Sequence, residues 1–318
     1  MKGVDSGVES GKKNIVGKRR YADGHWALTL MVLPAMLLTF VFCYIPMPGI
    51  VVAFKNLKFS QGIWGSAWCG TDNFKFLFES NTIGMLLRNT IGYNVAGLIL
   101  NIVFPVFFAL CLERIHRKLS IKVYQSAMFM PYFLSWIVVS YFTRTLFDYD
   151  LGIVNKLIEM FGGERTSFYT TPAVWPFILI FFAVWKALGY NTLVYYGQLL
   201  SIDPTLYEAA EIDGCGYFQK VRNITLPHLV QPILILLLLS IGNMFRSDYG
   251  LYYFLPEDKG ALIRATDVLD TYVIRTLRTA TNMGLSSAIS ALQSVVGFIL
   301  VLVANWLVRI YDKDSALF

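Results

Sequence analysis

The chain has 318 residues, of which 56% are hydrophobic and 15% are charged, and its mean hydropathy is +0.54. A soluble domain has about 25% charged residues, and a soluble core could not bury this much apolar surface without exposing large patches. The sequence therefore indicates an integral membrane protein. The formal net charge is +6, but the basic residues gather at the edges of long uncharged stretches, which excludes a nucleic-acid-binding protein.

Residue types that metal centres and hydrolytic active sites require are scarce. The four cysteines have no C-x-x-C spacing, and the chain has only three histidines. The segment Gly7–Lys13 has glycines and a lysine, but a phosphate-binding loop needs four residues between its glycines and Ser or Thr after the lysine. We therefore expect a chain that is not an enzyme, hydrolyses no ATP itself, and binds no metal or cofactor.

Charge-free runs predict an all-α membrane fold with about six transmembrane helices. A span needs about 20 mostly apolar residues, and charges in its centre are costly. The first run follows a polar segment that we expect to be disordered, and no signal-peptide cleavage site follows the run, so it is expected to remain as an anchor. Five charge-free runs lie between His25 and Lys55, Arg88 and Glu113, Lys122 and Arg144, Arg222 and Arg246, and Arg278 and Arg309. A sixth run, from Pro172 to Leu200, is apolar throughout except for Lys186.

Basic residues orient these spans. Short cytoplasmic segments carry an excess of Lys and Arg, and such an excess precedes the first run and fills the link between the second and third. Both termini are therefore expected in the cytoplasm, with a tail over residues 1–25, a transmembrane domain over 26–311 and a second tail over 312–318. The basic residues are Lys12, Lys13, Lys18, Arg19 and Arg20 before the first run, and Arg114, Arg117, Lys118 and Lys122 in the link.

The cytoplasmic loop 200–228 has the pattern of a helix–turn–helix. Asp203 can cap a helix that begins at Pro204, and Gly214 can end it in the left-handed conformation. A second short helix is expected over residues 217–223, ending before the next span opens at Leu226.

The first of these helices has a distinctive surface. Glu208, Glu211 and Ile212 fall on one face of the helix because they are spaced three and four residues apart. Ala209 and Ala210, next to that face, have small side chains that project little from the helix. A knob with small sides and an acidic tip can enter a groove on another protein.

This loop resembles the signature cytoplasmic loop of the permease subunits of binding-protein-dependent ABC importers. In that family the loop is the coupling helix that docks into a cleft of a separate ATPase subunit. The resemblance implies that Glu208 makes the polar contact, that the two alanines permit close approach and that Gly214 makes the turn. Cys215 stands where such permeases commonly have Ala, and a thiol is nearly as small, so docking should be unaffected. The matching residues are Glu208, Ala209, Ala210, Gly214, Ile224, Leu226 and Pro227.

Looser motifs extend the resemblance to the sugar-importing branch of the family. Residues 44–55, 70–74 and 148–155 look like the outer segments of its complex-oligosaccharide permeases. The resemblance covers about residues 26–311 and implies the maltose-permease (type I ABC importer) fold in a bacterial cytoplasmic membrane. It also implies an oligosaccharide substrate and several partners: a second, similar permease, two ATPase subunits that use ATP, an extracytoplasmic sugar-binding protein and membrane lipid.

In maltose-type permeases the sugar site lies on the fourth and fifth spans. A sugar needs aromatic platforms for its apolar faces and amides or carboxylates for its hydroxyls. The corresponding segments here contain Trp185, Lys186, Gly189, Tyr190 and Asn191 on the fourth span, and Asn243, Phe245 and Asp248 on the fifth. These residues are the candidate substrate contacts, although aromatic side chains in spans more often pack or face lipid.

Lys186 raises the question of substrate charge. An ammonium in an otherwise apolar run usually faces a cavity or a partner, unless it reaches the interface. No acid follows it on its own span before Asp203. Its counter-charge must come from another span, the partner permease or the cargo, so we hypothesise an oligosaccharide that carries uronic-acid carboxylates.

Three alternatives remain at this point. The chain is a permease of the same class for another solute, a membrane-bound glycosyl or acyl transferase, or a self-sufficient secondary transporter. A transferase should show clustered His or carboxylates near one membrane face, and a secondary transporter should show acid or His relays within the spans.

Overall fold

The computed structural model describes residues 17–79, 82–279 and 282–311. Contacts divide the chain into two compact units, one up to Val51 and a main unit from Val52 onward, and each is described by itself. Over the described residues the fold is almost entirely helical, as predicted. A two-stranded antiparallel hairpin near the start of the main unit pairs Lys55 with Trp68.

The first unit contains helix α1 (Gly17–Thr39), which continues as a wide π-helical turn, η1 (Phe40–Tyr44). Residues 17–25 were expected in a disordered tail but are helical, consistent with the good helix propensity of Lys18, Arg19 and Arg20. The rest of that tail and the predicted tail 312–318 lie outside the described residues.

Five stretches of described helix are long and apolar enough to cross a membrane, and a bent pair gives a sixth. The pair, residues 118–133 and 136–147, is bent by 100°, so the third predicted span is not one straight helix. The first span includes the C-terminal half of α1, and the bent pair is formed mainly by α5 (Lys118–Phe129) and α6 (Trp136–Phe147). The main helices of the other four spans are α4 (Thr82–Glu113), α8 (Trp175–Leu199), α11 (Leu226–Gly242) and α15 (Met283–Tyr311).

Local chemistry explains the break. Pro131 starts a short 3-10 turn, η3 (Met130–Phe133), where it has no N–H to continue the α-helical ladder. Leu134 is extended, and Ser135 then caps a new helix by accepting a hydrogen bond from the Val138 N–H. Hydropathy alone cannot register such a restart, because both halves are apolar.

Short elements connect these helices. They are η2 (Met47–Phe54), β1 (Lys55–Asn56), α2 (Gly62–Gly65), β2 (Ala67–Trp68), α3 (Asp72–Glu79), α7 (Ile153–Met160), η4 (Phe168–Thr170), η5 (Pro172–Val174), α9 (Pro204–Ile212), α10 (Tyr217–Lys220), η6 (Val221–Thr225), α12 (Tyr249–Phe254), α13 (Ile263–Thr266) and α14 (Leu269–Thr279).

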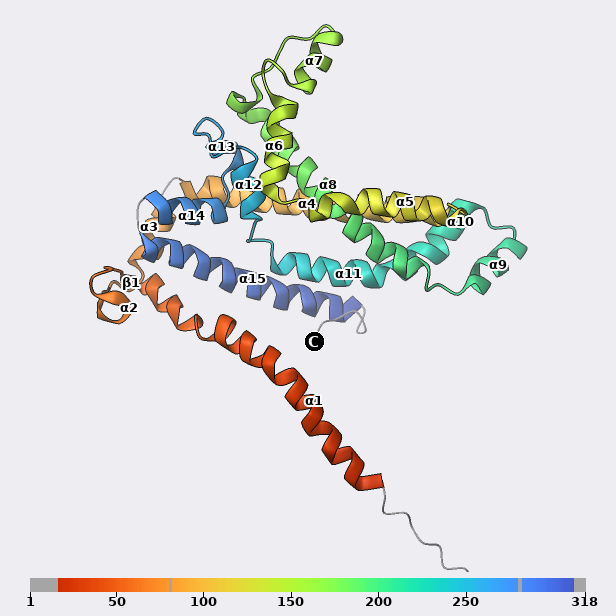
Figure 1. Cartoon of the computed structure of the whole chain (residues 1–318), viewed down its shortest axis with the longest axis horizontal. Helices are drawn as coiled ribbons and strands as arrows, with labels where there is room; N and C mark the ends of the chain where they lie inside the picture. The colour runs from red at the N-terminus through yellow and green to blue at the C-terminus, as the bar shows by residue number, and fades with distance from the viewer. Residues whose placement is uncertain (1–16, 80–81, 280–281, 312–318) are drawn as a thin grey trace, which may run out of the picture. The chain divides into compact units, whose positions relative to one another are not determined.

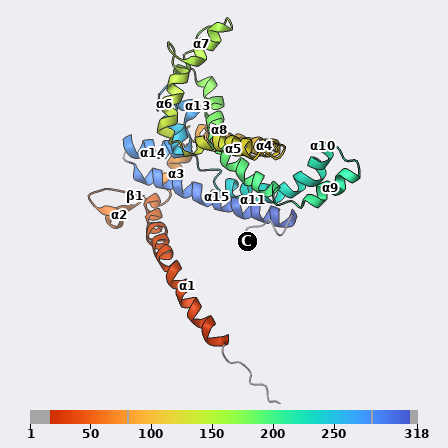
Figure 2. The same cartoon turned by 45° about the vertical axis from the view of Figure 1, so that its right-hand side comes forward.

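In the main unit, α4 packs along α8, and α11 lies beside α15 (Figures 1 and 2). Helices α9 and α10 project at one end of these long helices, and α3 and α14 lie at the other. The unit therefore has a loop end and an opposite end.

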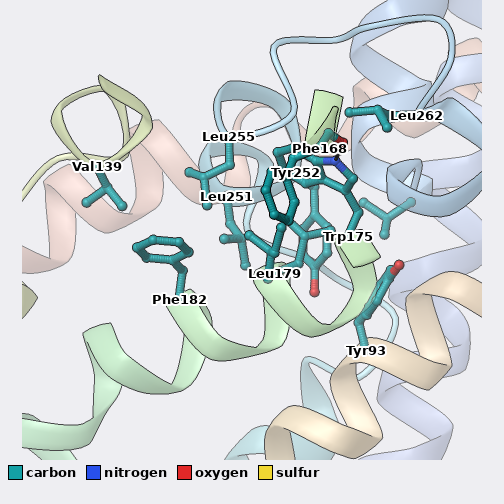
Figure 3. Close-up of a cluster of buried hydrophobic side chains, with 12 residues drawn as sticks. Tyr93, Val139, Phe168, Trp175, Leu179, Phe182, Leu251, Tyr252, Leu255 and Leu262 are labelled. Carbon is teal, nitrogen blue, oxygen red and sulfur yellow. Dashed lines mark hydrogen bonds between the residues drawn. The ribbon is translucent and has the colours of Figure 1, made fainter. Parts of the chain in front are cut away.

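The largest core cluster fixes the short helix α12 against the long helices (Figure 3). The Tyr252 ring of α12 lies 5.3 Å from the Tyr93 ring of α4, beside the fully buried Trp175 of α8. The Trp175 indole N–H donates to the Phe168 carbonyl at 2.8 Å, which satisfies its polar atom inside the core. This packing positions the N-terminal end of α12, where the functional site begins.

Candidate functional site

A cavity of about 760 Å³ lies between α4, α8, α11 and the start of α12. Its walls are mixed: tyrosine, tryptophan and leucine side chains alternate with amides and a few charged groups. Such a lining suits a ligand with apolar faces and many hydroxyls. The polar lining residues are Asn94, Asn101, Asn191, Asn243, Ser240, Lys186, Arg246 and Asp248.

The structure brings part of the predicted contact set together at this cavity. Lys186 and Asn191 line it from α8, and Asn243 and Asp248 line it from the segment after α11. Residues from two separate predicted spans therefore line the same cavity.

The other predicted contacts lie outside the lining. Trp185 packs edge-on against Phe182 at 5.8 Å, and Phe245 packs against a second buried cluster. Tyr190 stacks on Tyr132 at 5.3 Å. Gly189 is a point of close approach between α8 and the preceding broken span, because a Cβ there would lie 2.1 Å from the Met128 carbonyl oxygen. These side chains consequently support the helices that form the wall.

Lys186 has an internal partner that the sequence did not reveal. Its ammonium lies over the Trp136 ring, 4.3 Å from the ring centre. The Trp136 indole N–H donates to one carboxylate oxygen of Asp248, and the other accepts the Gly250 N–H at 2.9 Å. A cation, an indole and a carboxylate thus form a chain along the cavity wall, joining α8, α6 and α12.

Helix α4 supplies cavity residues that sequence reasoning missed. Asn94 and Asn101 both line the cavity, and their spacing of seven puts them on one face of the helix. Two amides seven residues apart in an apolar span are a signal that could have identified this face. Trp136 gave no such signal, because a helix-starting tryptophan is common near a membrane interface.

Asn94 also shapes the segment between α11 and α12. Its amide donates to the carbonyl of Met244 at 2.9 Å and lies 3.2 Å from the Ser247 hydroxyl. Backbone outside regular structure is tolerated at membrane depth only where other groups satisfy it or water reaches it. Asn94 therefore stabilises, through these hydrogen bonds, the irregular backbone segment that contains Asn243 and Asp248.

Two further side chains complete this support. Gln293 donates to the Phe245 carbonyl at 2.6 Å, and the Asp270 carboxylate accepts the Ser247 N–H at 2.7 Å. Burial raises the pKa of the Asp270 carboxyl, and the hydrogen bonds from Ser247 and Gln293 oppose that shift. The segment is thus anchored to α4, α14 and α15.

The cavity carries an excess of positive charge. Its charged lining residues are two cations, Lys186 and Arg246, and one carboxylate, Asp248. Arg246 donates to the Ser294 hydroxyl at 3.1 Å, and Asp248 is occupied by Trp136 and Gly250. No described carboxylate lies within ion-pairing distance of either cation, so both retain capacity for an anionic ligand.

The predicted helix–turn at the loop end is confirmed. Helix α9 (Pro204–Ile212) begins with Asp203 accepting the Thr205 N–H at 2.9 Å, and this bond is the main reason that the pKa of Asp203 is lowered. Gly214 follows with φ +76°, and the Cys215 N–H donates to the Ala210 carbonyl at 2.9 Å. This arrangement satisfies a terminal carbonyl of the helix.

The predicted end of the second short helix is wrong. Instead of stopping near Asn223, α10 runs through the π-helical turn η6 into α11, with the Leu226 N–H bonded to the Val221 carbonyl. A proline in a regular α-helix clashes with the carbonyl four residues earlier. The wider turn before Pro227 relieves that clash, so the helix continues without a break.

The two predicted acidic residues of the knob are not equivalent. Glu211 pairs with Lys220 at 2.6 Å, and this hydrogen bond lowers the pKa of the Glu211 carboxyl. Glu208 is exposed and forms no ion pair within the described part of the chain. The side chain of Ile212 nearby is 88% exposed, and Phe218 on α10 is 84% exposed. The knob therefore presents the Glu208 carboxylate, without an ion-pair partner in the described part of the chain, near apolar side chains.

The remaining residues of the predicted docking set connect the knob to the spans. Ala210 is buried, and Ile224 packs against a cluster that includes Ala109, Tyr195 and Leu229. Leu226 and Pro227 begin α11. Displacement of the knob would therefore reach α4, α8 and α11, the same helices that line the cavity.

Several apolar helices around a partly charged cavity, with an exposed helical loop at one end, are typical of a polytopic membrane transport subunit. Residues 101–316 match the family described as binding-protein-dependent transport system inner membrane component. The chain belongs to this family of ABC importer permeases.

Individual relatives and structures agree with this assignment. The chain is 32% identical over 288 residues to the polygalacturonan/rhamnogalacturonan transport system permease protein YteP of Bacillus subtilis, covering 91% of this chain and 89% of that protein. It is 29% identical to the sn-glycerol-3-phosphate transport system permease protein UgpA of Escherichia coli, covering 87% and 91%. A crystal structure of a bacterial ABC transporter involved in the import of the acidic polysaccharide alginate matches with a TM-score of 0.82 and 28% identity, covering 92% and 99%.

Proposed function

We propose that this permease moves oligosaccharides bearing uronic-acid carboxylates into the cell. The observation that carries the proposal is the net positive charge of the cavity lining. Lys186 and Arg246 are its cations, and its one carboxylate, Asp248, already accepts a hydrogen bond from Trp136. The asparagine amides of the same wall suit sugar hydroxyls, and Trp136 and Tyr132 supply aromatic surface. The names of its relatives support this reading, since polygalacturonan, rhamnogalacturonan and alginate are polymers that contain uronic acids.

The working unit that we propose is a heterodimer with a second, similar permease, two ATPase subunits and an extracytoplasmic binding protein. Six spans can line only half of a pathway. The α9 knob would dock into the ATPase through Glu208, Ala209, Ala210 and Gly214, and both termini would be cytoplasmic. Uptake by this chain reconstituted alone would contradict the proposed assembly.

Uptake of charge-matched substrates tests the cargo. Wild type and Lys186→Met are compared with oligogalacturonides, with neutral oligosaccharides of equal length and with glycerol 3-phosphate. Methionine keeps much of the length and apolar bulk of lysine but removes the charge. The matched control is Lys156→Met, because Lys156 is an exposed residue of α7 outside the cavity.

We expect Lys186→Met to lower oligogalacturonide uptake by about tenfold, the effect of roughly one charge-assisted hydrogen bond. The control variant, Lys156→Met, should take up oligogalacturonide at the wild-type rate. If Lys186→Met lowers uptake of neutral and acidic oligosaccharides equally, or lowers neither, Lys186 does not recognise substrate charge. The substrate would then be a neutral oligosaccharide. Uptake of glycerol 3-phosphate in preference to either would identify a small phosphorylated solute instead.

A further inference from the structure

A second hollow, of about 530 Å³, lies on the main unit between the first turns of α4, the start of α8 and α13. Tyr93 lines both this hollow and the cavity described above. We call it the arginine groove, because two guanidinium groups stand at its edge. Its lining residues are Arg88, Asn89, Gly92, Tyr93, Pro172, Ala173, Pro176, Ile180, Arg264 and Ala265.

Both arginines line the groove, and neither has an acid partner among the described residues. Asn89, next to Arg88, donates its amide to the backbone carbonyl of Arg264 at 3.1 Å, which ties the two positions together. Both side chains are exposed, and no carboxylate of the described residues lies within 4.0 Å of either guanidinium. The two guanidinium groups together have ten N–H donors. One of them, on Arg88, donates to the Asn89 side-chain oxygen at 3.3 Å.

The rest of the groove has little to offer a sugar. The Asn89 amide is occupied by two backbone carbonyls, those of Arg264 and Asp267, and the Tyr93 hydroxyl donates to the Ala265 carbonyl. The other lining side chains are glycine, alanine, proline and isoleucine. Unlike the cavity, the groove combines paired cations at its edge with an apolar floor.

The floor runs along the direction of the spans. Pro172, Pro176 and Ile180 recur every four residues from η5 into α8, which makes a stripe of about 12 Å. On α4, Gly92 lies one turn beyond Arg88, and the charge-free run of that span begins immediately after Arg88. The guanidinium groups thus stand at the boundary where the polar part of the molecule ends, and the apolar stripe continues from them into the membrane-spanning part.

We propose that the arginine groove binds an anionic phospholipid, with its phosphate on Arg88 and Arg264 and one acyl chain along Pro176, Ile180 and Gly92. The planar guanidinium fork matches phosphate oxygens, and the apolar stripe is comparable with one leaflet of the hydrocarbon core, about 15 Å. Because α13 and α8 both contribute to the cavity-side core through Ala265 and Trp175, the bound lipid would brace the end of the molecule opposite the α9 knob.

The assembled importer tests this proposal without a transport assay. Complexes containing wild type or Arg88→Gln/Arg264→Gln are purified into nanodiscs of phosphatidylglycerol and phosphatidylcholine in equal amounts, and retained lipid is measured by native mass spectrometry. The control is Arg309→Gln, an exposed arginine at the far end of α15. Arg88→Lys/Arg264→Lys keeps both charges but removes the forks.

We expect wild type and the Arg309 variant to retain phosphatidylglycerol selectively. Retention of phosphatidylglycerol by Arg88→Gln/Arg264→Gln should be at least about tenfold lower than by wild type. Retention by Arg88→Lys/Arg264→Lys should lie between those two values. Subunit co-purification reports folding separately, because the Arg88 guanidinium also donates a hydrogen bond to the buried Asn89 side chain. Equal retention in all variants, or equal retention of both lipids, would overturn the proposal, and so would displacement of the lipid by oligogalacturonide, which would make the groove a cargo site.

Discussion

The ammonium of Lys186 lies 4.3 Å from the centre of the Trp136 ring, which joins the fourth span to the first turn of α6. The ring faces a cation while its N–H is bonded to Asp248. The indole therefore bridges a positive and a negative group without letting them neutralise each other directly. A cation held by an aromatic face remains available to an anion from the cavity.

Replacement of Trp136 should weaken uptake of an acidic substrate. Trp136→Leu removes a cation–π contact of about 0.5–2 kcal/mol and a hydrogen bond to a carboxylate of about 1.5–3 kcal/mol. We expect uptake at subsaturating oligogalacturonide to fall by about tenfold or more, and less in Trp136→Phe, which keeps a ring under Lys186. Trp306→Leu, an exposed tryptophan of α15, is the control. Unchanged uptake in Trp136→Leu would mean that Lys186 needs no such support.

The stability of the protein should depend on the side-chain oxygen of Asp248 and not on its negative charge. It caps α12 by accepting the Gly250 N–H, and removal of such a cap costs about 0.5–2 kcal/mol. We expect Asp248→Ala to lower the unfolding temperature of the purified complex, and Asp248→Asn to leave it near wild type because the amide oxygen also caps. Equal melting temperatures for the two variants would argue against the cap.

Two glycines of α8 should respond oppositely to alanine. At Gly189 a Cβ would lie 2.1 Å from the Met128 carbonyl oxygen, whereas at Gly197 it would meet nothing within 4 Å. Gly189→Ala should cost about 1–3 kcal/mol through overpacking, and Gly197→Ala should be neutral or stabilise by up to about 1 kcal/mol. Thermal unfolding in detergent measures both. A neutral Gly189→Ala would mean that α5 and α8 separate more easily than their packing indicates.

The exposed carboxylate of the α9 knob should matter more than its neighbour. Glu208→Lys reverses an exposed charge that has no ion-pair partner among the described residues, so ATPase co-purification or sugar-stimulated ATP hydrolysis should fall strongly while the binding protein still binds sugar. Glu211→Gln should have a small effect, because Glu211 is already paired with Lys220 and exposed pairs are worth about 0–1 kcal/mol. Full transport and normal ATPase recovery in Glu208→Lys would refute the docking role.

A buried ion pair should hold the end of the molecule opposite the α9 knob. Asp267 is 2% exposed, and both of its oxygens accept hydrogen bonds from Arg275 at 2.8 and 2.9 Å. Asp267→Ala should cost about 3–5 kcal/mol, the usual result of removing one partner of a buried pair. Asp72→Ala, which breaks an exposed pair with Lys75, should change the unfolding temperature little. A similar small shift for both variants would show that the buried pair adds nothing.

The local features of this protein could be predicted from its sequence. The cap at Asp203, the helix that starts at Pro204 and the left-handed turn at Gly214 depend on neighbouring residues alone, and each is found as predicted. The positions of the apolar runs also depend only on composition along the chain. The same holds for the family signature, which is a pattern of adjacent residues.

Apart from α4, where two amides mark one face, only the tertiary structure decided which side of each span faces the cavity. Helices such as α4 and α8 are apolar all round, so their hydrophobic periodicity does not indicate an inward face. Trp185 and Lys186 are adjacent in sequence, yet one packs in the core and the other lines the cavity. The contact of Lys186 with Trp136 and the break before α6 arise because distant helices pack together, and no local pattern contains that information.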